Sequence, residues 1–345
     1  MLDVLFATIV ISFLATYMTI PYFIRFLNRA GIVGRDMNKL NKPEVPEMGA
    51  PIVVLGFLTG IFFYTWINVF VYKNIQQLIE ILAAVSTILI ITIIGMFDDL
   101  SILFKARGQG KFKNHKRIGL RQWQKPLLTL PAAIPLMAIM AGNSSMIFPI
   151  IGEVNIGILY PFLIVPVAVA GASNGFNLLG GLNGLETSLG TILLTSLGIF
   201  AYITGSIEAS FLAFAFAAAL LAFLKFNWYP AKIFPGDSLS YTIGAVIATT
   251  AIIGNIEKFA IYIFGMFFIE LLLKFRSRFQ AENFGRIRPD GTLEAPYNKI
   301  YSLTHVMMKL GNFKEWQLTL MLIGVQLIFV IIAFALTLNV LEISL

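Results

Sequence analysis

The sequence has no cysteine and only two histidines among its 345 residues. The missing cysteines exclude disulfide bonds and thiolate metal sites, and they leave the redox compartment open. Charged residues are also scarce: they make up 12% of the chain, whereas a soluble domain carries about 25%. No basic segment precedes the first apolar block and no small-residue cleavage site follows it, so no cleavable signal peptide is expected. We interpret His115 and His305 as ordinary loop residues.

Apolar sequence, in contrast, is abundant and makes up 58% of the chain. It occurs in blocks instead of alternating with polar residues, which indicates membrane spans rather than one large soluble core. Ten such blocks are present, at 4–23, 50–71, 78–96, 127–141, 157–171, 188–205, 209–224, 239–254, 259–273 and 316–340. We therefore predict an all-α integral membrane protein with about ten transmembrane helices. Four prolines in the fourth and fifth blocks predict kinks there.

The basic residues lie almost entirely on one side of these predicted spans. Of the 25 Lys and Arg residues, 23 fall in the connections that follow odd-numbered blocks, and only Lys73 and Lys258 fall on the opposite side. The positive-inside rule then places both termini outside and explains the net charge of +7 without nucleic acid as a partner. It predicts three long cytoplasmic loops, at about 24–49, 97–126 and 274–315. With no internal repeat visible, residues 1–345 are expected to form a single polytopic membrane domain.

Two adjacent carboxylates, Asp98 and Asp99, follow the third apolar block directly. Such a pair at a membrane boundary is costly unless it meets a cation. Lys125 lies at the start of the fourth block, where its ammonium group can reach back toward the pair or toward a phosphate. The alternative interpretation is a solvated helix end.

The stretch 171–186 is rich in glycine and asparagine. Asn174, Asn177 and Gly181 are spaced i, i+3 and i+7, so a helix would place them on one face. The asparagine amide supplies both an acceptor and donors, which suits a metal ion, a phosphate or a base edge. Glycines let a ligand approach the backbone closely. A capped helix break between two spans is the alternative.

The segment Phe234-Pro-Gly-Asp237 precedes the eighth apolar block. Asp237 could cap that helix and bind a metal ion at the same time. Phe234, beside a tight turn, could stack on a base, although such residues are more often interfacial anchors.

The last long loop contains Pro-Asp-Gly, which is a turn signal, and its flanks can pair as a hairpin. Arg286 and Arg288 would point to the same side of a strand, as a clamp for a pyrophosphate. The alternative is a basic loop that touches lipid headgroups.

In combination and order, these motifs resemble those of the polyprenyl-phosphate N-acetylhexosamine-1-phosphate transferases over nearly the whole chain. The run from Asn174 to Glu186 is similar to the eukaryotic and archaeal branch, the dolichyl-phosphate GlcNAc-1-phosphate transferases. Bacterial members usually carry aspartates where this chain has Gly180 or Gly181 and Asn183. The eukaryotic and archaeal branch has Arg-His-Arg in the last loop, where this chain has isoleucine between its two arginines.

The resemblance implies a catalytic centre formed by Asp98, Asp99 and Lys125. It also implies that Asn177 and Asp237 bind Mg²⁺, or Mn²⁺ in its place, together with the substrate pyrophosphate. The implied nucleotide-binding residues are Glu47, Gly181, Asn183 and Phe234. The implied sugar- and pyrophosphate-binding residues are Asn174, Glu186, Arg286 and Arg288.

The activity implied by the resemblance is transfer of GlcNAc-1-phosphate from UDP-GlcNAc to a polyprenyl (dolichyl) phosphate. UMP is released, and the reaction is the first step of lipid-linked oligosaccharide synthesis for N-glycosylation. The site would face the cytoplasm, and the protein would form a homodimer. One alternative is the same chemistry with another UDP-HexNAc or with undecaprenyl phosphate in cell-envelope polymer synthesis. Two others, from different classes, are a lipid-linked sugar transporter or flippase and a nucleotide-binding scaffold. Transporters place charge near the bilayer midplane and often contain repeats, and this sequence shows neither.

Overall fold

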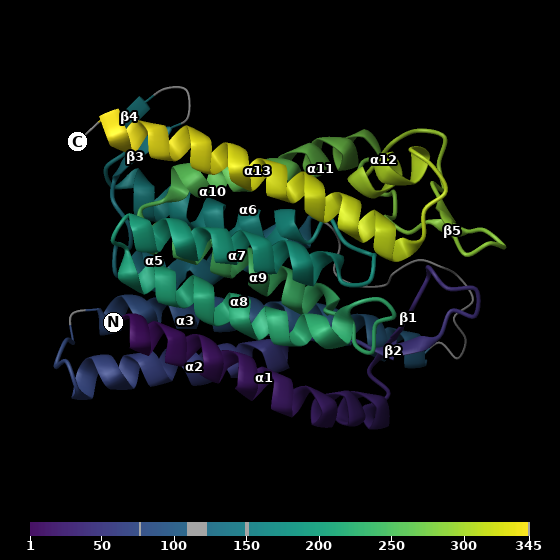
Figure 1. Ribbon diagram of the computed structural model, residues 1–345, viewed down its shortest axis with the longest axis horizontal. Helices are drawn as coiled ribbons and strands as arrows, with labels where there is room; N and C mark the ends of the chain where they lie inside the picture. The colour runs from purple at the N-terminus through teal and green to yellow at the C-terminus, as the bar shows by residue number, and fades with distance from the viewer. Residues whose placement is uncertain (76, 109–122, 149–151, 344–345) are drawn as a thin grey trace.

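The structure is a computed structural model that describes the chain except residues 76, 109–122, 149–151 and 344–345. Helices account for most of it, and they run roughly side by side (Figure 1). In chain order they are α1 (Leu2–Ala30), α2 (Ala50–Phe70), α3 (Leu78–Gly108), α4 (Gln124–Thr129), the 3-10 helix η1 (Leu130–Ala133), α5 (Ile134–Ala138), the π-helix η2 (Tyr160–Ile164), α6 (Val165–Phe176), α7 (Leu185–Ile203), α8 (Ile207–Asn227), α9 (Gly236–Gly254), α10 (Glu257–Ile263), α11 (Gly265–Arg276), α12 (Leu303–Lys309) and α13 (Glu315–Ile343).

Seven helices of the described chain are long and apolar enough to cross a membrane, namely α1, α2, α3, α7, α8, α9 and α13. The protein is therefore an α-helical integral membrane protein. The other three apolar blocks form interrupted helices. The fourth block changes from α-helix to 3-10 helix and back, and the fifth begins as a π-helix, so the irregularities predicted from their prolines are confirmed. The ninth block is divided between α10 and α11 at Phe264.

Three short antiparallel hairpins connect the helices. They consist of β1 (Val33–Arg35) with β2 (Glu44–Pro46), β3 (Ser145–Phe148) with β4 (Gly152–Asn155), and β5 (Arg286–Ile287) with β6 (Leu293–Glu294). In the last hairpin Arg286 is opposite Glu294, which confirms the hairpin predicted around Pro-Asp-Gly.

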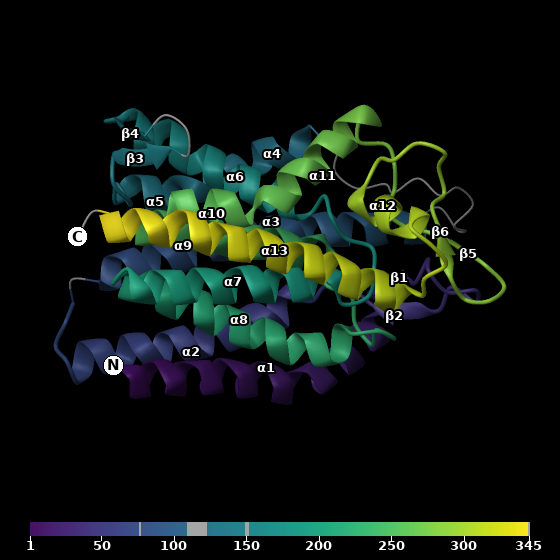
Figure 2. The same cartoon turned by 45° about the horizontal axis from the view of Figure 1, so that its top comes forward.

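The two ends of the helix bundle differ in what they carry. Both termini and the β3–β4 hairpin lie at one end, whereas β1, β2, β5, β6 and α12 lie at the other, in both views (Figures 1 and 2). Two of the three long loops predicted from charge, at about 24–49 and 274–315, therefore meet at one end. Of the third, predicted at about 97–126, residues 97–108 belong to helix α3 and are not loop, and residues 109–122 lie outside the described residues.

Helix α9 is the most buried of the long helices, and it packs against α3, α6, α7 and α8. Its N-terminus points to the loop-rich end of the bundle. Helix α3 approaches α9 closely because Gly95 has no side chain: a Cβ atom there would lie 2.5 Å from Ser238 Cα. One helix turn beyond, the hydroxyls of Thr92 and Thr242 are hydrogen-bonded at 2.9 Å. This contact brings the part of α3 from Gly95 to Asp99 beside the start of α9.

Candidate active site

Three of the predicted catalytic and metal-binding side chains meet where α3 passes the N-terminus of α9. Lys125 Nζ lies 2.8 Å from Asp98 Oδ2 and 2.8 Å from Asp237 Oδ2. The Tyr241 hydroxyl, one turn along α9, donates to Asp98 Oδ2 at 3.4 Å. The predicted contact between Lys125 and Asp98 is therefore confirmed, and one ammonium group bridges carboxylates from two helices.

The ammonium group of Lys125 is held in its charged form. Burial lowers the pKa of Lys125, but the nearby Asp237, Tyr241 and Asp98 outweigh that effect and raise the pKa above its usual value. A cation near opposite charges is favoured in its ionised form. Lys125 is therefore a fixed positive charge at the centre of the cluster.

Asp99 has a different role from its neighbour. Its carboxylate accepts hydrogen bonds from the backbone N–H groups of Asp237, at 2.8 Å, and of Ser238, at 3.2 Å. These are orphan donors of the first turn of α9, so Asp99 caps that helix from another part of the chain. Gly236 makes room for the cap, because a Cβ atom there would lie 2.5 Å from Asp99 Oδ2. Asp98 thus holds the lysine, and Asp99 holds the backbone of Asp237.

The loop between α1 and α2 forms one wall of this centre. The Phe234 N–H donates to the Pro46 carbonyl at 2.7 Å, and Glu47 pairs with Phe234 in a short parallel bridge. The Glu47 carboxylate is close enough to interact electrostatically with Asp99. Two predicted nucleotide-binding residues, far apart in sequence, are therefore adjacent to the acidic pair.

The glycine-rich stretch is not one helical face, and that part of the prediction is wrong. Helix α6 ends at Phe176, so Asn177 is its C-cap, and Gly181 has a φ of +88° outside any helix. The chain then turns through Gly184 into α7. Glycine is needed at both turns because residues with a Cβ atom rarely adopt a positive φ.

Each remaining predicted side chain of this stretch has its own surroundings. The Asn174 amide donates to Thr129 Oγ1 at 2.9 Å, one turn after Lys125. The hydroxyl of Ser240, on the first turn of α9, hydrogen-bonds to Glu186 Oε1. Asn177 is half-buried, and its amide has no hydrogen-bond partner within the described part of the chain.

Sequence reasoning missed a second polar cluster that holds Asn183. The Asn183 N–H donates to Glu315 Oε1 at 2.8 Å, and its amide donates to Asp36 Oδ2 at 3.1 Å. Lys39 forms ion pairs with both carboxylates. The only sequence signals were an Asp and a Lys three residues apart in the first loop and a Glu at the start of the last span.

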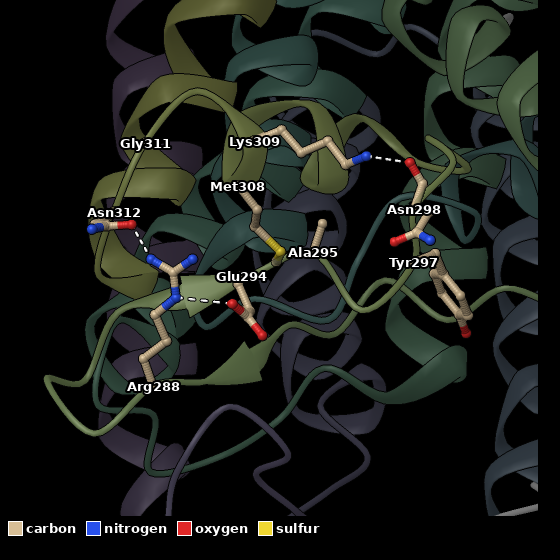
Figure 3. A pocket seen from close by; sticks show the side chains of 9 residues that line it. All are labelled: Arg288, Glu294, Ala295, Tyr297, Asn298, Met308, Lys309, Gly311 and Asn312. Carbon is tan, nitrogen blue, oxygen red and sulfur yellow. Dashed lines mark hydrogen bonds and ion pairs between the residues drawn. The ribbon is translucent and has the colours of Figure 1, made fainter.

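The two arginines of the last hairpin line separate cavities. Arg288 donates to Glu294 Oε2 at 2.9 Å and also bonds to Asn312, at the edge of a cavity of about 530 Å³ (Figure 3). Arg286 lines another cavity of about 420 Å³, together with Met37 of the first long loop. Tyr297 lines both cavities, so the two arginines lie at neighbouring cavities of the last loop.

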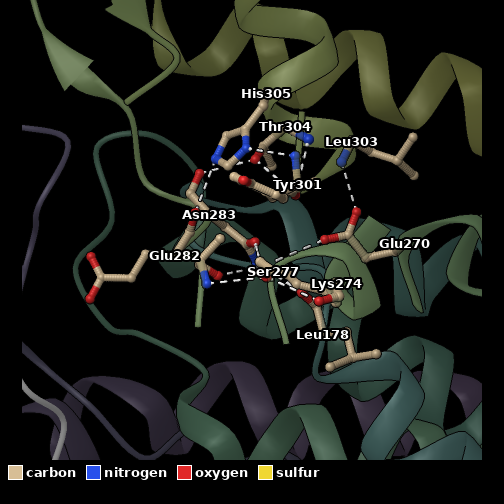
Figure 4. Close-up of polar contacts among 12 residues, drawn as sticks. Leu178, Glu270, Lys274, Ser277, Glu282, Asn283, Tyr301, Leu303, Thr304 and His305 are labelled. Atoms are coloured by element: carbon tan, nitrogen blue, oxygen red, sulfur yellow. Dashed lines mark hydrogen bonds and ion pairs between the residues drawn. The ribbon is translucent and has the colours of Figure 1, made fainter. Parts of the chain in front are cut away.

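Buried polar contacts attach the last loop to the helices (Figure 4). Glu270 and Lys274, spaced i, i+4 on α11, form an ion pair with 3.8 Å between Oε1 and Nζ. Lys274 also bonds to Asn283, whose amide donates to the Leu178 carbonyl at 2.9 Å. The last loop is therefore tied to the glycine-rich stretch beside Asn177.

His305 is more than the ordinary loop residue predicted from the sequence. It is fully buried in α12, and its Nε2 lies 3.0 Å from the Glu282 carbonyl oxygen. Burial and the nearby Lys274 lower the pKa of His305 to about 4. The ring is therefore neutral at physiological pH and supports the last loop.

The donor atoms around Asp237 are of the kind that Mg²⁺ prefers. Within the described residues, no group of three or more His, Cys, Asp or Glu side chains is placed to hold a metal ion. Mg²⁺ is usually held by one or two carboxylates and by substrate phosphates rather than by an all-protein cage. The carboxylates of Asp98 and Asp237, which meet at Lys125, offer oxygen ligands of this kind.

Proteins of known family are similar in sequence to the part of the chain that forms this site. A family model described as glycosyl transferase family 4 matches residues 81–255, which include the acidic pair, Lys125, the glycine-rich stretch and Asp237. A relative from Saccharolobus solfataricus is 35% identical over 330 residues, and one from Sulfolobus acidocaldarius is 31% identical over 328, each match covering 94% of both chains. Both carry the provisional name UDP-N-acetylglucosamine–dolichyl-phosphate N-acetylglucosaminephosphotransferase.

A bacterial relative is similar to a smaller part of the chain. The phospho-N-acetylmuramoyl-pentapeptide-transferase of Clostridium beijerinckii is 32% identical over 273 residues, which cover 77% of this chain and 79% of that protein. The resemblance inferred from the motifs is therefore confirmed, and the chain belongs to glycosyl transferase family 4.

Proposed function

We propose that this protein transfers GlcNAc-1-phosphate from UDP-GlcNAc to a polyprenyl phosphate of the dolichyl type and releases UMP. The single observation that carries the proposal is the bridge of Lys125 between Asp98 and Asp237, at a helix N-terminus capped by Asp99. Fixed cations, a helix N-terminus and oxygen ligands are what phosphoryl transfer requires, because its catalysis is mostly positioning and charge neutralisation. The names of the two archaeal relatives support the same substrates.

In this proposal the lipid phosphate is the nucleophile. Its second pKa is about 6, judged from phosphorylated side chains, so it is largely dianionic at neutral pH and needs no strong general base. It attacks the β-phosphorus of UDP-GlcNAc, the bond from that phosphorus to the bridging oxygen breaks, and UMP leaves with the electron pair. Lys125 neutralises phosphate charge, while Asp98 orients its ammonium group. A covalent intermediate on an aspartate is the second mechanism.

Mg²⁺, or Mn²⁺ in its place, would be held by Asp237 and Asn177. When bound, it supplies positive charge to the pyrophosphate oxygens. Asp99 keeps the backbone at Asp237 in place through its two N–H bonds. The half-buried Asn177 amide has its oxygen available for this role within the described structure.

The nucleotide and the sugar would occupy the loops around this centre. Phe234 and Glu47, which are paired beside Asp99, would contact the nucleoside, and Gly181 and Asn183 would hydrogen-bond the base. The resemblance assigns the sugar and the pyrophosphate to Asn174, Glu186, Arg286 and Arg288. Because the two arginines line separate cavities, we propose that substrate draws the last hairpin toward the centre.

The membrane arrangement follows from the same proposal. The site would face the cytoplasm, where UDP-sugars are dissolved, with about ten spans and both termini on the far side. The charge distribution supports this orientation, and so does the gathering of long loops opposite both termini. Dimerisation of the chain belongs to this proposal as well.

A second candidate keeps the chemistry and changes the substrates. The Clostridium relative is named for a phospho-N-acetylmuramoyl-pentapeptide, so another UDP-HexNAc with undecaprenyl phosphate is the alternative pair. Membership of a transferase family disfavours the transporter and scaffold interpretations.

The test is UMP release by the detergent-purified protein, given UDP-GlcNAc, a short polyprenyl phosphate and Mg²⁺. Asp237→Ala should abolish release, whereas Asp3→Ala, an exposed carboxylate near the N-terminus, should leave it unchanged. Release with a different UDP-sugar alone would correct the substrate. No release with any UDP-sugar from folded wild-type protein would refute the proposed function.

A further inference from the structure

A buried polar cluster lies beside the proposed nucleotide site and shares Asn183 with it. We call it the Glu315 cluster; it consists of Asp36, Asn38, Lys39, Asn183 and Glu315. Its members come from the loop between β1 and β2, the glycine-rich stretch and the first residue of α13. All except Lys39 are at most 5% exposed. Three parts of the chain that are far apart in sequence therefore share one water-poor network.

Glu315 is the hub of this cluster. Its Oε1 accepts from the Asn183 N–H at 2.8 Å and from the Asn38 amide at 3.3 Å. Its other oxygen forms an ion pair with Lys39. The Asn38 amide also donates to the Gly181 carbonyl at 2.7 Å. The cluster thus fixes the backbone on both sides of Leu182.

Asp36 fixes the Asn183 side chain in turn. Its Oδ2 accepts from the Asn183 amide at 3.1 Å, and its Oδ1 accepts from the Asn38 N–H at 3.1 Å. A carboxylate offers only acceptors, so it selects the amide orientation with the NH₂ group toward it. The Asn183 amide oxygen is then turned away from Asp36, where it can accept a hydrogen bond from a ligand.

Lys39 makes this arrangement electrostatically tolerable. It lies 3.2 Å from Asp36 Oδ2, contacts Glu315 and sits 4.2 Å from the ring centre of Tyr229. Burial lowers the pKa of Lys39, but Glu315 and Asp36 raise it above its usual value overall. Well-packed apolar residues often replace a buried ion pair without loss of stability. We therefore attribute to this cluster the positioning of particular backbone and side-chain atoms rather than a gain in stability.

We propose that the Glu315 cluster is a positioning device for nucleotide recognition. The inference rests on the proposed function, and it assigns to Asp36, Lys39 and Glu315 the role of fixing the Gly181 carbonyl and the Asn183 amide for the uridine nucleotide. None of the three touches the phosphate centre around Lys125, whose described partners are Asp98, Asp237 and Tyr241.

The test is a separation of kinetic constants in Glu315→Ala and Asp36→Ala. UMP release is measured while UDP-GlcNAc and polyprenyl phosphate are varied in turn. Hydrogen bonds to charged groups are the strong ones, so the KM for UDP-GlcNAc should rise about tenfold or more. The kcat and the KM for polyprenyl phosphate should stay within about twofold of wild type, because only nucleotide binding is affected.

Two further variants separate positioning from folding. Glu315→Gln keeps an oxygen for the Asn183 N–H but loses the charge opposite Lys39, so its KM for UDP-GlcNAc should lie between those of wild type and Glu315→Ala. Glu257→Gln makes the same chemical change in the first turn of another helix, where the carboxylate accepts from Tyr160 at the far end of the bundle. It should leave both KM values unchanged.

An unchanged KM for UDP-GlcNAc in folded Glu315→Ala and Asp36→Ala would overturn the inference while leaving the proposed function intact. Equal rises in both KM values would also overturn it, since they would indicate a general structural defect. If Glu315→Ala does not fold, Glu315→Gln decides the matter, because a wild-type KM in that variant overturns the inference. Absence of turnover in the wild-type protein would instead refute the proposed function, and this inference with it.

Discussion

Replacing Lys125 by methionine tests the centre of the site most directly. Methionine retains much of the length and apolar volume of lysine but removes the ammonium group, which lies 2.8 Å from both Asp98 and Asp237. The two carboxylates would then face each other without a cation between them. Both stability and phosphate binding should suffer.

The magnitude follows from burial. The side chains of Lys125, Asp98 and Asp237 are 12%, 0% and 13% exposed, so solvent screens them poorly. Removing one partner of a buried ion pair costs about 3–5 kcal/mol, because the other charge is left uncompensated. We expect a loss of that order in the free energy of unfolding. UMP release should fall by a factor of about 10² or more, as when a fixed electrostatic contact to the transition state is removed.

A double variant separates the two effects. Asp98→Asn removes one of the uncompensated charges that Lys125→Met creates, so the double variant should regain about 1–3 kcal/mol of stability. It brings no cation back to the phosphates, so UMP release should stay as low as in Lys125→Met.

Thermal unfolding in detergent and UMP release provide the measurements. Lys225→Met is the matched control, because that lysine is exposed and its amine hydrogen-bonds to the Tyr17 hydroxyl. It should change neither quantity. A Lys125→Met protein with wild-type stability, or a double variant that regains turnover, would refute the role given to this lysine.

Two more predictions concern groups that support the site. Asp99→Ala removes the cap on α9, so it should lower the free energy of unfolding by about 0.5–2 kcal/mol and abolish UMP release. Asp99→Asn should retain more stability than Asp99→Ala. Wild-type turnover in Asp99→Ala would contradict the assigned role. The ordinary pKa of histidine is 6.5, and burial lowers the pKa of His305 to about 4. Between these two values the unfolded chain binds a proton at His305 that the folded chain does not bind. The free energy of unfolding is therefore unaffected by His305 above pH 6.5, and it decreases as the pH falls toward 4, by about 3 kcal/mol in total. As the pH is lowered from 7.5 to 4.5, the melting temperature of His305→Gln should fall less steeply than that of the wild-type protein. Equal slopes of melting temperature against pH in the two proteins would contradict this prediction.

The local motifs could be predicted because they depend on neighbours in sequence. The turn at Pro-Asp-Gly and the irregular helices at the prolines each involve residues within a few positions of one another. The family could also be identified, because its motifs occur in a fixed order along the chain.

The partners of the polar side chains could not be predicted in the same way. Nothing near Asn183 in the sequence indicates that its N–H donates to Glu315 and that its amide NH₂ donates to Asp36. The bond from Arg288 to Asn312 likewise joins residues 24 positions apart. The two bonds of Asn183 span 132 and 147 positions in the sequence, and no local pattern encodes contacts over such separations.

The sequence by itself determined the membrane class and the family, since hydrophobic length and motif order are properties of the chain alone. Only the tertiary structure decided how the acidic pair is divided, with Asp98 on Lys125 and Asp99 on the N-terminus of α9. It also decided that a Glu at the start of α13 holds the glycine-rich stretch. The physical reason is the same in both cases. A buried charge must find a partner wherever packing brings one close, and packing depends on the whole fold.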